Sequence, residues 1–391
     1  MPIELRDALD QQLPAALRQQ LTQHGFDQER LVTLASSLRT SAPSVRRDLR
    51  NRIRGPVFAP TPDEIPPVPP PDSRDARRLT AIGQGMLRRG EVAFCVMAGG
   101  MATRMGGVVK ALVEAFDGRT FLALRLAENN YWSVRAGIPV PLWLMTSDAT
   151  QPGIASALAK APSHVRTFEQ DLSVRLTSEG GLFLEDDGSP STYATGHGDL
   201  PDALRRSGLL DAFRARGGKV VWITNLDNLG ATIDPVILGS FVEARRPVMV
   251  EVCEKAPGDR GGIPVHAERH LQVLEEFRLP KDFDASEVPV FNTNTFLVEA
   301  EALATASISW NWFEVEKTVE GRVAIQFERL LQELTGALPS AYLTVPREGE
   351  ESRFLPVKDF DELTRRRSTI ELVARARGML PARSNRTSEP S

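Results

Sequence analysis

Residues 92–110 of the chain read VAFCVMAGGMATRMGGVVK, an apolar run followed by a loop with two glycine pairs and two cations. The apolar run, residues 92–97, predicts a buried strand. Paired glycines let the backbone turn sharply and come close to a ligand. Consecutive N–H groups in such a loop form a concavity for anions, and Arg104 and Lys110 add cations for phosphate oxygens. The stretch therefore predicts a nucleotide phosphate loop.

The spacing of this loop fits neither standard phosphate motif. A Walker loop ends in Gly-Lys-Ser/Thr, whereas Lys110 is followed by Ala111. A dinucleotide fingerprint needs G-x-G-x-x-G, which residues 99–104 do not supply. A plain strand-to-helix turn is the alternative, and two glycine pairs with two cations in one loop disfavour it.

Composition limits the classes of partner. The 391 residues carry a net charge of −4, so no electrostatic argument favours nucleic acid or an anionic membrane, and neither is expected as a partner. The two cysteines cannot form a disulfide framework, and no Cys/His spacing resembles a zinc site. No apolar run approaches the roughly 20 residues of a membrane helix, and the first residues do not read as a signal peptide. We therefore expect a cytoplasmic protein.

The chain divides into three predicted parts. Residues 1–90 combine amphipathic helical segments with a proline-rich strap, and residues 359–391 form a short helix and a disordered tail. Between them, residues 91–358 alternate strand-like and helical runs, which is typical of an α/β layer structure with a largely parallel sheet. Further strands are expected at 140–145, 219–224, 247–251, 290–296 and 340–344, and helices at 121–136, 201–216, 235–245 and 319–333.

Three other segments carry polar residues where a ligand could use them. Flanking glycines leave the ring of His197 accessible, although a helix cap at Asp199 beside a surface histidine explains the same residues. Asp227 stands where a buried strand ends and could hold Mg²⁺, although a turn-forming Asx cluster is an equal alternative. Amides inside the apolar run 291–296 need partners, which sugar hydroxyls or the protein itself would provide.

Taken together, the segments resemble the UTP–glucose-1-phosphate uridylyltransferase family, the wider group of UDP-sugar pyrophosphorylases. The resemblance runs from about Val92 to Lys358, and its motifs occur in order along the chain. They are the loop at 98–110, DGRTFL at 117–122, TGHGD at 195–199, SGLLD at 207–211, NLDNLGATID at 225–234, FNTN at 291–294 and RFLPVK at 353–358.

The resemblance implies a three-layer Rossmann-like nucleotidyltransferase (GT-A-like) fold with a mixed, mostly parallel sheet, preceded by the N-terminal helical segment. It also implies that residues 91–358 form the catalytic domain and transfer a uridylyl group from UTP to a sugar 1-phosphate, with Mg²⁺ as cofactor. Glucose 1-phosphate is the expected acceptor. The alternatives are an N-acetylhexosamine or another sugar 1-phosphate, or a pseudoenzyme that binds nucleotide sugars without turnover.

Matching positions give each candidate residue an implied role. Lys110, Lys358 and Arg104 would contact phosphates, and Asp227 would hold Mg²⁺. The nucleotide would lie against Ala98, Gly99, Gly100, Gln170 and Gly196. The sugar phosphate would contact His197, and sugar hydroxyls would bind Asn225 and Asn294.

The chain departs from the family pattern at the phosphate loop, which is shorter and has Val109 where proline usually precedes the lysine. This spacing is similar to molybdenum-cofactor nucleotidyltransferases, but every later segment disfavours a molybdopterin substrate. The β-helix domain that follows Lys358 in many family members is not expected here, so we expect a monomer or a dimer.

Overall fold

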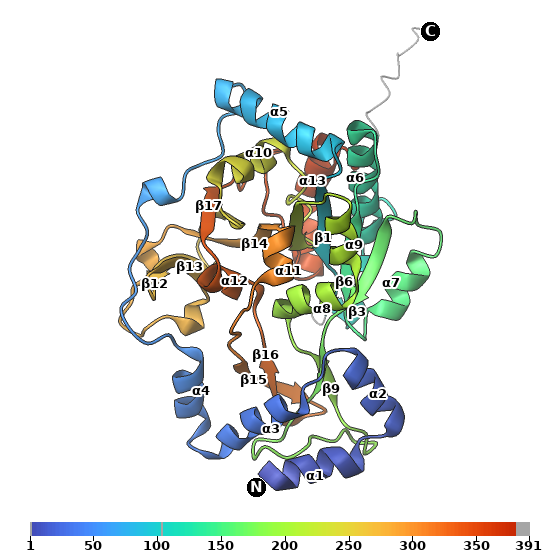
Figure 1. Ribbon diagram of the computed structural model, residues 1–391, viewed down its shortest axis with the longest axis vertical. Helices are drawn as coiled ribbons and strands as arrows, with labels where there is room; N and C mark the ends of the chain where they lie inside the picture. The colour runs from blue at the N-terminus through green and yellow to red at the C-terminus, as the bar shows by residue number, and fades with distance from the viewer. Residues whose placement is uncertain (1, 103–104, 381–391) are drawn as a thin grey trace.

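A seven-stranded sheet forms the centre of the computed structural model, which describes residues 2–102 and 105–380 (Figure 1). The strand order is β17-β11-β14-β10-β1-β6-β7, and only β14 runs antiparallel to its neighbours. The strands are β1 (Val92–Met97), β6 (Leu142–Thr146), β7 (Val165–Glu169), β10 (Val220–Asn225), β11 (Val248–Glu254), β14 (Val290–Glu299) and β17 (Ser340–Thr344). The predicted mixed, mostly parallel sheet is confirmed.

Helices cover both faces of this sheet. Phe94 of β1 points to one face, where Arg125 of α6 (Phe121–Ala136) lies over its ring at 5.6 Å. Trp143, the β6 residue paired with Cys95, points to the other face and meets Phe213 of α9 (Leu209–Ala215) edge to face. All six residues of β1 are therefore buried, as a continuous apolar strand between two helical layers should be.

Two glycines allow a pair of helices to approach each other closely. Helices α5 (Arg74–Arg88) and α10 (Pro235–Ala244) lie together at the top of Figure 1. A Cβ on Gly83 would stand 2.1 Å from the carbonyl oxygen of Pro235, and one on Gly239 would stand 2.3 Å from that of Leu79. Only hydrogen fits at these crossings, so the two backbones approach directly.

The N-terminal helices build a second hydrophobic core with two hairpins, at the opposite end of the molecule (Figure 1). The helices are α1 (Pro2–Gln12), α2 (Ala15–Gln23) and α3 (Gln28–Ser36), and the hairpins are β8–β9 (Leu172–Val174, Thr192–Ala194) and β15–β16 (Phe313–Val319, Arg322–Glu328). Leu9 and Leu21 pack there with Ile325 and Phe327. This second core fixes the hairpins that border the candidate site described below.

The proline-rich strap runs along the outer strand of the sheet. Val68 donates its N–H to the carbonyl of Thr344 and Pro66 accepts the N–H of Thr344, both at 2.9 Å. Phe58 forms an antiparallel bridge, with backbone bonds in both directions, to His266 in the hairpin β12–β13 (Ile263–Ala267, His270–Leu274). The strap thus uses backbone groups of an edge strand that would otherwise stay unpaired.

The remaining elements are short. They are α4 (Pro43–Asn51), β2 (Met101–Ala102), β3 (Val108–Val109), β4 (Glu114–Phe116), β5 (Arg119–Thr120), α7 (Gln151–Ala157), α8 (Leu200–Arg206), α11 (Ala300–Thr305), α12 (Leu334–Ala337) and α13 (Phe360–Ala376). None of the helices among the described residues has the length and apolar character needed to cross a membrane. The predicted disordered tail falls at residues 381–391, outside the described part of the chain.

Two helix predictions need correction. The helix expected at 319–333 is wrong: β15 turns back into β16 there, because Glu320 and Gly321 both take positive φ, +49° and +76°, and close a tight hairpin. The single helix expected at 201–216 is two helices, since Gly208 at φ +74° interrupts it between α8 and α9.

Candidate active site

A cavity of about 740 Å³ opens where the parallel strands β1, β6 and β10 end. In open α/β sheets this edge is where ligands bind. Nine of the predicted site residues line it: Ala98, Gly99, Gly100, Lys110, Gln170, Gly196, His197, Asn225 and Asp227. The sequence therefore located most of one shared cleft from segments up to 129 positions apart.

The phosphate loop itself folds as a small hairpin over this cavity. Met101 and Ala102 of β2 pair with Val109 and Val108 of β3. Gly106 and Gly107, before β3, take φ values of +81° and +74°, a conformation that favours glycine. The hairpin places Lys110, the next residue after β3, on the cavity wall. Arg104, the other predicted cation of the loop, lies outside the described residues.

Lys110 forms an ion pair with Asp227. Its Nζ lies 2.6 Å from Oδ2 of Asp227, and both side chains are largely shielded, with 20% and 13% of their surfaces exposed. The N–H of Val357 donates to the same Oδ2 at 3.1 Å. Three segments that are far apart in sequence thus meet at one carboxylate.

Lys358, the residue after Val357, has an exposed side chain and does not line the cavity. Its backbone N–H donates to Oε2 of Glu362 at 2.7 Å, which fixes the start of α13 beside Asp227. The backbone of Lys358 therefore lies next to the site. Its ammonium group contacts none of the other predicted site residues in the described part of the chain.

Arg125 holds the loop that carries Asp227. The guanidinium is fully buried and donates to the carbonyl oxygens of residues 225, 226, 228 and 231. It also pairs with Glu128 at 2.7 Å, and Glu128 in turn accepts the N–H of Ile233. Burial raises the pKa of Glu128, and the charge of Arg125 opposes that rise. This clamp fixes the backbone on both sides of the carboxylate.

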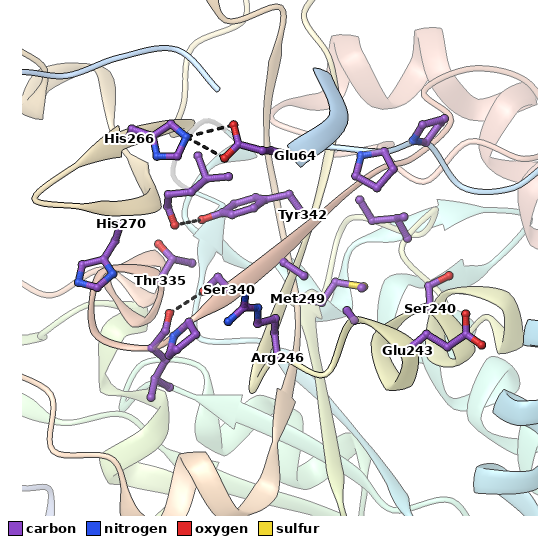
Figure 2. Close-up of a pocket in the computed structure, with 18 of the residues that line it drawn as sticks. Glu64, Ser240, Glu243, Arg246, Met249, His266, His270, Thr335, Ser340 and Tyr342 are labelled. Carbon is purple, nitrogen blue, oxygen red and sulfur yellow. Dashed lines mark hydrogen bonds and ion pairs between the residues drawn. The ribbon is translucent and has the colours of Figure 1, made fainter. Parts of the chain in front are cut away.

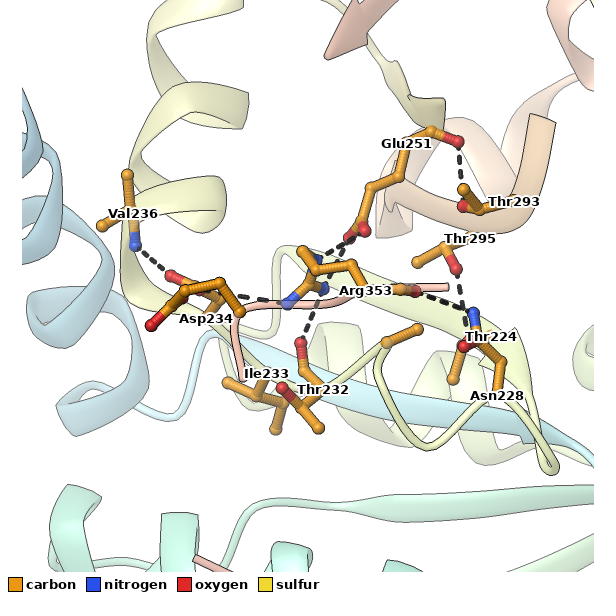
Figure 3. A network of polar contacts seen from close by, with 12 residues as sticks. Thr224, Asn228, Thr232, Ile233, Asp234, Val236, Glu251, Thr293, Thr295 and Arg353 are labelled. Carbon is orange, nitrogen blue, oxygen red and sulfur yellow. Dashed lines mark hydrogen bonds and ion pairs between the residues drawn. The ribbon is translucent and has the colours of Figure 1, made fainter. Parts of the chain in front are cut away.

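Arg353 fastens the segment before Lys358 to the same loop (Figure 3). Its guanidinium forms two bonds of 2.7 Å to Glu251 of β11, and it donates to the carbonyl of Thr232 at 2.8 Å. Asn228 bridges the backbone of this segment, donating to the carbonyl of Arg353 and accepting the N–H of Leu355. The position of Val357 beside Asp227 follows from these bonds.

Gln170 joins the glycine loop to the second glycine segment. Its Nε2 donates to the carbonyl of Gly196 at 2.8 Å, and its Oε1 would lie 2.1 Å from a Cβ placed on Gly99. Gly196 has φ +103°, and a Cβ there would stand 2.5 Å from the carbonyl oxygen of Arg329. Both glycines therefore bring backbone against the wall of the cavity where a planar base could lie.

We predict that Gly196→Ala lowers the free energy of unfolding by about 3 kcal/mol or more, because left-handed strain adds to a backbone clash. Gly188 is a matched control, since its φ of +82° is similar but nothing lies within 4 Å of an added Cβ. Gly188→Ala should cost only about 1 kcal/mol. Urea unfolding measures both values, and equal losses would contradict the clash.

His197 is held as a neutral ring. Its Nδ1 accepts the N–H of Leu331 at 2.9 Å, which leaves the proton on Nε2. Burial lowers the pKa of His197 to about 4. A neutral imidazole with a protonated Nε2 can donate one hydrogen bond to a phosphate or sugar oxygen.

Acid should therefore destabilise the protein through His197. The pKa of this ring is near 6.5 in the unfolded chain and about 4 in the folded protein. Its contribution to the free energy of unfolding is therefore complete above pH 6.5 and is lost as the pH falls towards about 4. Over this range wild-type stability should fall relative to His197→Gln by up to about 1.4 kcal/mol per pH unit. Urea unfolding at several pH values tests this, and parallel curves would refute it.

Asn294 occupies a bulge in β14 with a positive φ of +59°. Its Nδ2 donates to Oδ1 of Asn225 at 3.1 Å, so the two predicted sugar-binding amides lie side by side. Its Oδ1 is buried and accepts no hydrogen bond from the described residues. A buried amide oxygen without a donor is an exception that a ligand hydroxyl could explain.

A buried charge cluster lies behind the Gly196–His197 segment. Arg329 contacts Asp171 and Asp199 at 2.8 Å and Asp202 at 2.6 Å, and Arg206 pairs with Asp171 at 2.7 Å. Arg205 also pairs with Asp202, at 3.3 Å, so three guanidinium groups face the three carboxylates. Burial raises the pKa of Asp199 to about 8, against the effect of Arg329.

Sequence reasoning missed the three buried arginines that position the site, Arg125, Arg329 and Arg353, as functional residues. A signal existed for two of them. Arg125 interrupts the apolar face of the helix predicted at 121–136, and Arg353 opens the motif whose lysine was chosen instead. Arg329 carried no such signal, because its surroundings were read as helix.

The cavity residues suit a Mg²⁺ site in which the substrate's phosphate oxygens supply some of the ligands. Among the described residues no group of three or more His, Cys, Asp or Glu side chains could enclose a metal ion. Asp227 offers one carboxylate at the cavity, and Mg²⁺ commonly takes one or two carboxylates together with phosphate oxygens and water. The donor set therefore fits a magnesium ion that arrives with a nucleotide.

A family model described as UTP–glucose-1-phosphate uridylyltransferase matches residues 61–390. The chain belongs to this family. It is 30% identical over 335 residues to the enzyme of that name from Hordeum vulgare, covering 78% of this chain and 67% of the relative. It is 32% identical over 318 residues to that of Solanum tuberosum, covering 75% and 65%. The match thus spans about two thirds of these relatives' length.

Solved structures of two sugar-nucleotide enzymes share the fold. UDP-glucose phosphorylase from Trypanosoma brucei superposes with a TM-score of 0.73 at 22% identity, covering 89% of this chain and 77% of that one. The V402W mutant of UDP-glucose pyrophosphorylase from Leishmania major gives 0.66 at 23% identity, covering 93% and 77%. The predicted family and nucleotidyltransferase fold are confirmed.

Proposed function

We propose that this protein makes UDP-glucose and pyrophosphate from UTP and glucose 1-phosphate. The observation that carries the proposal is the meeting of Lys110, Asp227 and the Val357 N–H at one cavity beneath the glycine loop. Family membership supplies the reaction class, and relatives that bear this name match most of the chain.

The reaction requires alignment and charge neutralisation more than proton transfer. An oxygen of the sugar 1-phosphate attacks the α-phosphorus of UTP in line, and the bond to pyrophosphate breaks. The attacking oxygen is already anionic at neutral pH, so no general base is needed. The barrier comes from repulsion between anions and from orientation, which positioned cations and dipoles lower.

In this proposal each cation contacts a different part of the triphosphate. Lys110, freed from Asp227 when substrates bind, contacts the β- and γ-phosphates that leave as pyrophosphate. Lys358, on the segment fixed by Arg353, swings its exposed side chain to the α-phosphate. Asp227 would hold Mg²⁺, and the ion would neutralise charge on the phosphates.

The other predicted residues orient the two substrates. Gln170 and the backbone of Ala98–Gly100 and Gly196 line the part of the cavity assigned to uracil and ribose. The Nε2–H of His197 faces the sugar phosphate, and the paired amides of Asn225 and Asn294 bind sugar hydroxyls. The unpaired Oδ1 of Asn294 supports this last assignment.

A coupled assay of pyrophosphate release tests the proposal. We expect turnover with UTP and glucose 1-phosphate, loss of turnover when EDTA removes Mg²⁺, and little with ATP or GTP. Turnover only with an N-acetylhexosamine 1-phosphate would replace glucose as the substrate. Tight binding of UDP-glucose without release from any pair would identify a pseudoenzyme. The cytoplasmic location and the monomeric or dimeric state stay predictions, the latter open to light scattering.

A further inference from the structure

A second cavity, of about 730 Å³, lies on the outer side of the sheet and shares no lining residue with the nucleotide cavity (Figure 2). Its walls come from the proline strap, α5, α10, the hairpin β12–β13, α12 and β17. Its volume falls within the ~300–1,000 Å³ typical of small-molecule sites. The cavity is therefore large enough for a metabolite and separate from the proposed reaction.

Bonds between distant segments hold these walls in place. Glu64 of the strap pairs with His266 of β12 at 2.9 Å, and Tyr342 of β17 donates its hydroxyl to the carbonyl of Leu271 (Figure 2). The backbone bonds between Val68 and Thr344 fix the strap along β17. A site that is formed before its ligand arrives loses less conformational freedom on binding.

Among the described residues, the ionisable side chains that lack partners in this cavity are basic. Arg246, Arg269 and His270 line it, and within residues 2–102 and 105–380 their side chains form no hydrogen bond or ion pair. Both lining carboxylates are already satisfied: Glu64 by His266, and Glu243 by Arg78 of α5. Figure 2 shows Arg246 extending from the end of α10 towards Ser340. Two guanidinium groups without acceptors are suited to a phosphate.

The rest of the lining combines apolar side chains with the hydroxyls of Ser240, Thr335 and Ser340, which already donate to backbone carbonyls. Leu79, Met249 and Leu343 contribute aliphatic surface, and the rings of Pro66, Pro67 and Pro69 form the outer rim. Such a lining accepts a ring or hydrocarbon body, while a few polar groups fix its orientation. Charge and lining together define a ligand with one anionic end and one apolar part.

We propose that this cavity is a binding site for a small phosphate monoester with an apolar or ring-shaped organic part. Arg246 and Arg269 bind the phosphate oxygens, His270 adds a hydrogen bond, and the organic part lies over Met249 under the proline rim. The proposal does not depend on the uridylyltransferase reaction.

Phenyl phosphate is a suitable probe, with binding measured by titration calorimetry on the full chain. We expect the dissociation constant to rise at least about tenfold in the double variant Arg246→Gln/Arg269→Gln, because charge-assisted bonds are lost. Both arginines are exposed, so the variant should fold, which its thermal unfolding checks. The matched control is Arg245→Gln, whose arginine is exposed next to Arg246 but lines a different cavity.

The variant Lys110→Ala tests which of the two cavities binds phenyl phosphate. We expect it to leave phenyl phosphate binding unchanged. Loss of binding in Lys110→Ala but not in the double variant would place the probe in the nucleotide cavity and overturn the proposal. An equal loss in Arg245→Gln would show general attraction to surface charge, and no measurable binding by the wild-type chain would also overturn it.

Discussion

Lys110→Ala should lower turnover of UTP and glucose 1-phosphate by about 10²–10³-fold, the usual cost of removing one donor that stabilises developing negative charge. The ammonium group is the described cation that directly contacts Asp227, at 2.6 Å, so it lies where phosphates and Mg²⁺ would meet. The loss should appear in kcat as well as in kcat/KM, since charge on the leaving pyrophosphate grows as its bond breaks.

The fold should survive this change. Asp227 keeps the N–H of Val357, and its loop keeps the Arg125 clamp, so the carboxylate stays in place without its ammonium partner. Lys160→Ala, on an exposed turn, serves as the control and should leave turnover unchanged. Near-normal pyrophosphate release by Lys110→Ala, with an unchanged thermal midpoint, would refute the role given to Lys110.

Arg353→Met should destabilise the protein by about 3–5 kcal/mol, because it leaves the carboxylate of Glu251 buried without its counter-ion. The side chains of Arg353 and Glu251 are only 2% and 0% exposed, so water cannot replace the lost guanidinium. The same change frees the segment that carries Val357 and Lys358. Urea unfolding monitored by circular dichroism gives the free energy.

A double variant distinguishes the lost charge pair from lost packing. Glu251→Met/Arg353→Met removes both charges and should recover most of the stability lost in Arg353→Met, since a buried pair often gives little net gain over apolar groups. Turnover should remain low in the double variant, because the bond from Arg353 to the carbonyl of Thr232 is absent. If the single variant is as stable as wild type, Arg353 does not have the structural role described.

Local pattern was sufficient for the elements that position the glycine loop. Strand β1 matches the predicted 92–97, and α6 and β17 match residues 121–136 and 340–344. These segments have strong periodicity or continuous apolar runs between clear turn residues. The helix expected at 319–333 failed because its apolar residues also suit a hairpin, and the second core with the N-terminal helices selects the strand.

Part of the cavity lining could be predicted from the sheet topology instead of from local pattern. Because the carboxyl ends of parallel strands meet at one edge, the residues that follow β1 and β10 were expected at the same edge of the sheet. That they are direct neighbours depends on the strand order, which places β1 beside β10. The pairing of Asn225 with Asn294 needed more, since it depends on the antiparallel β14 and its bulge. The exposed position of Lys358 was not predictable from its motif.

The sequence by itself determined the family, the sheet and the glycine loop, because these follow from short-range patterns of apolar residues, glycines and charges. Only the tertiary structure decided how the site is held. Arg125 and Arg353 find their acceptors about 100 positions away in sequence, as the bonds to residues 226 and 251 illustrate. No local pattern encodes such contacts, because a buried charge is satisfied by whichever groups the packed fold brings to it.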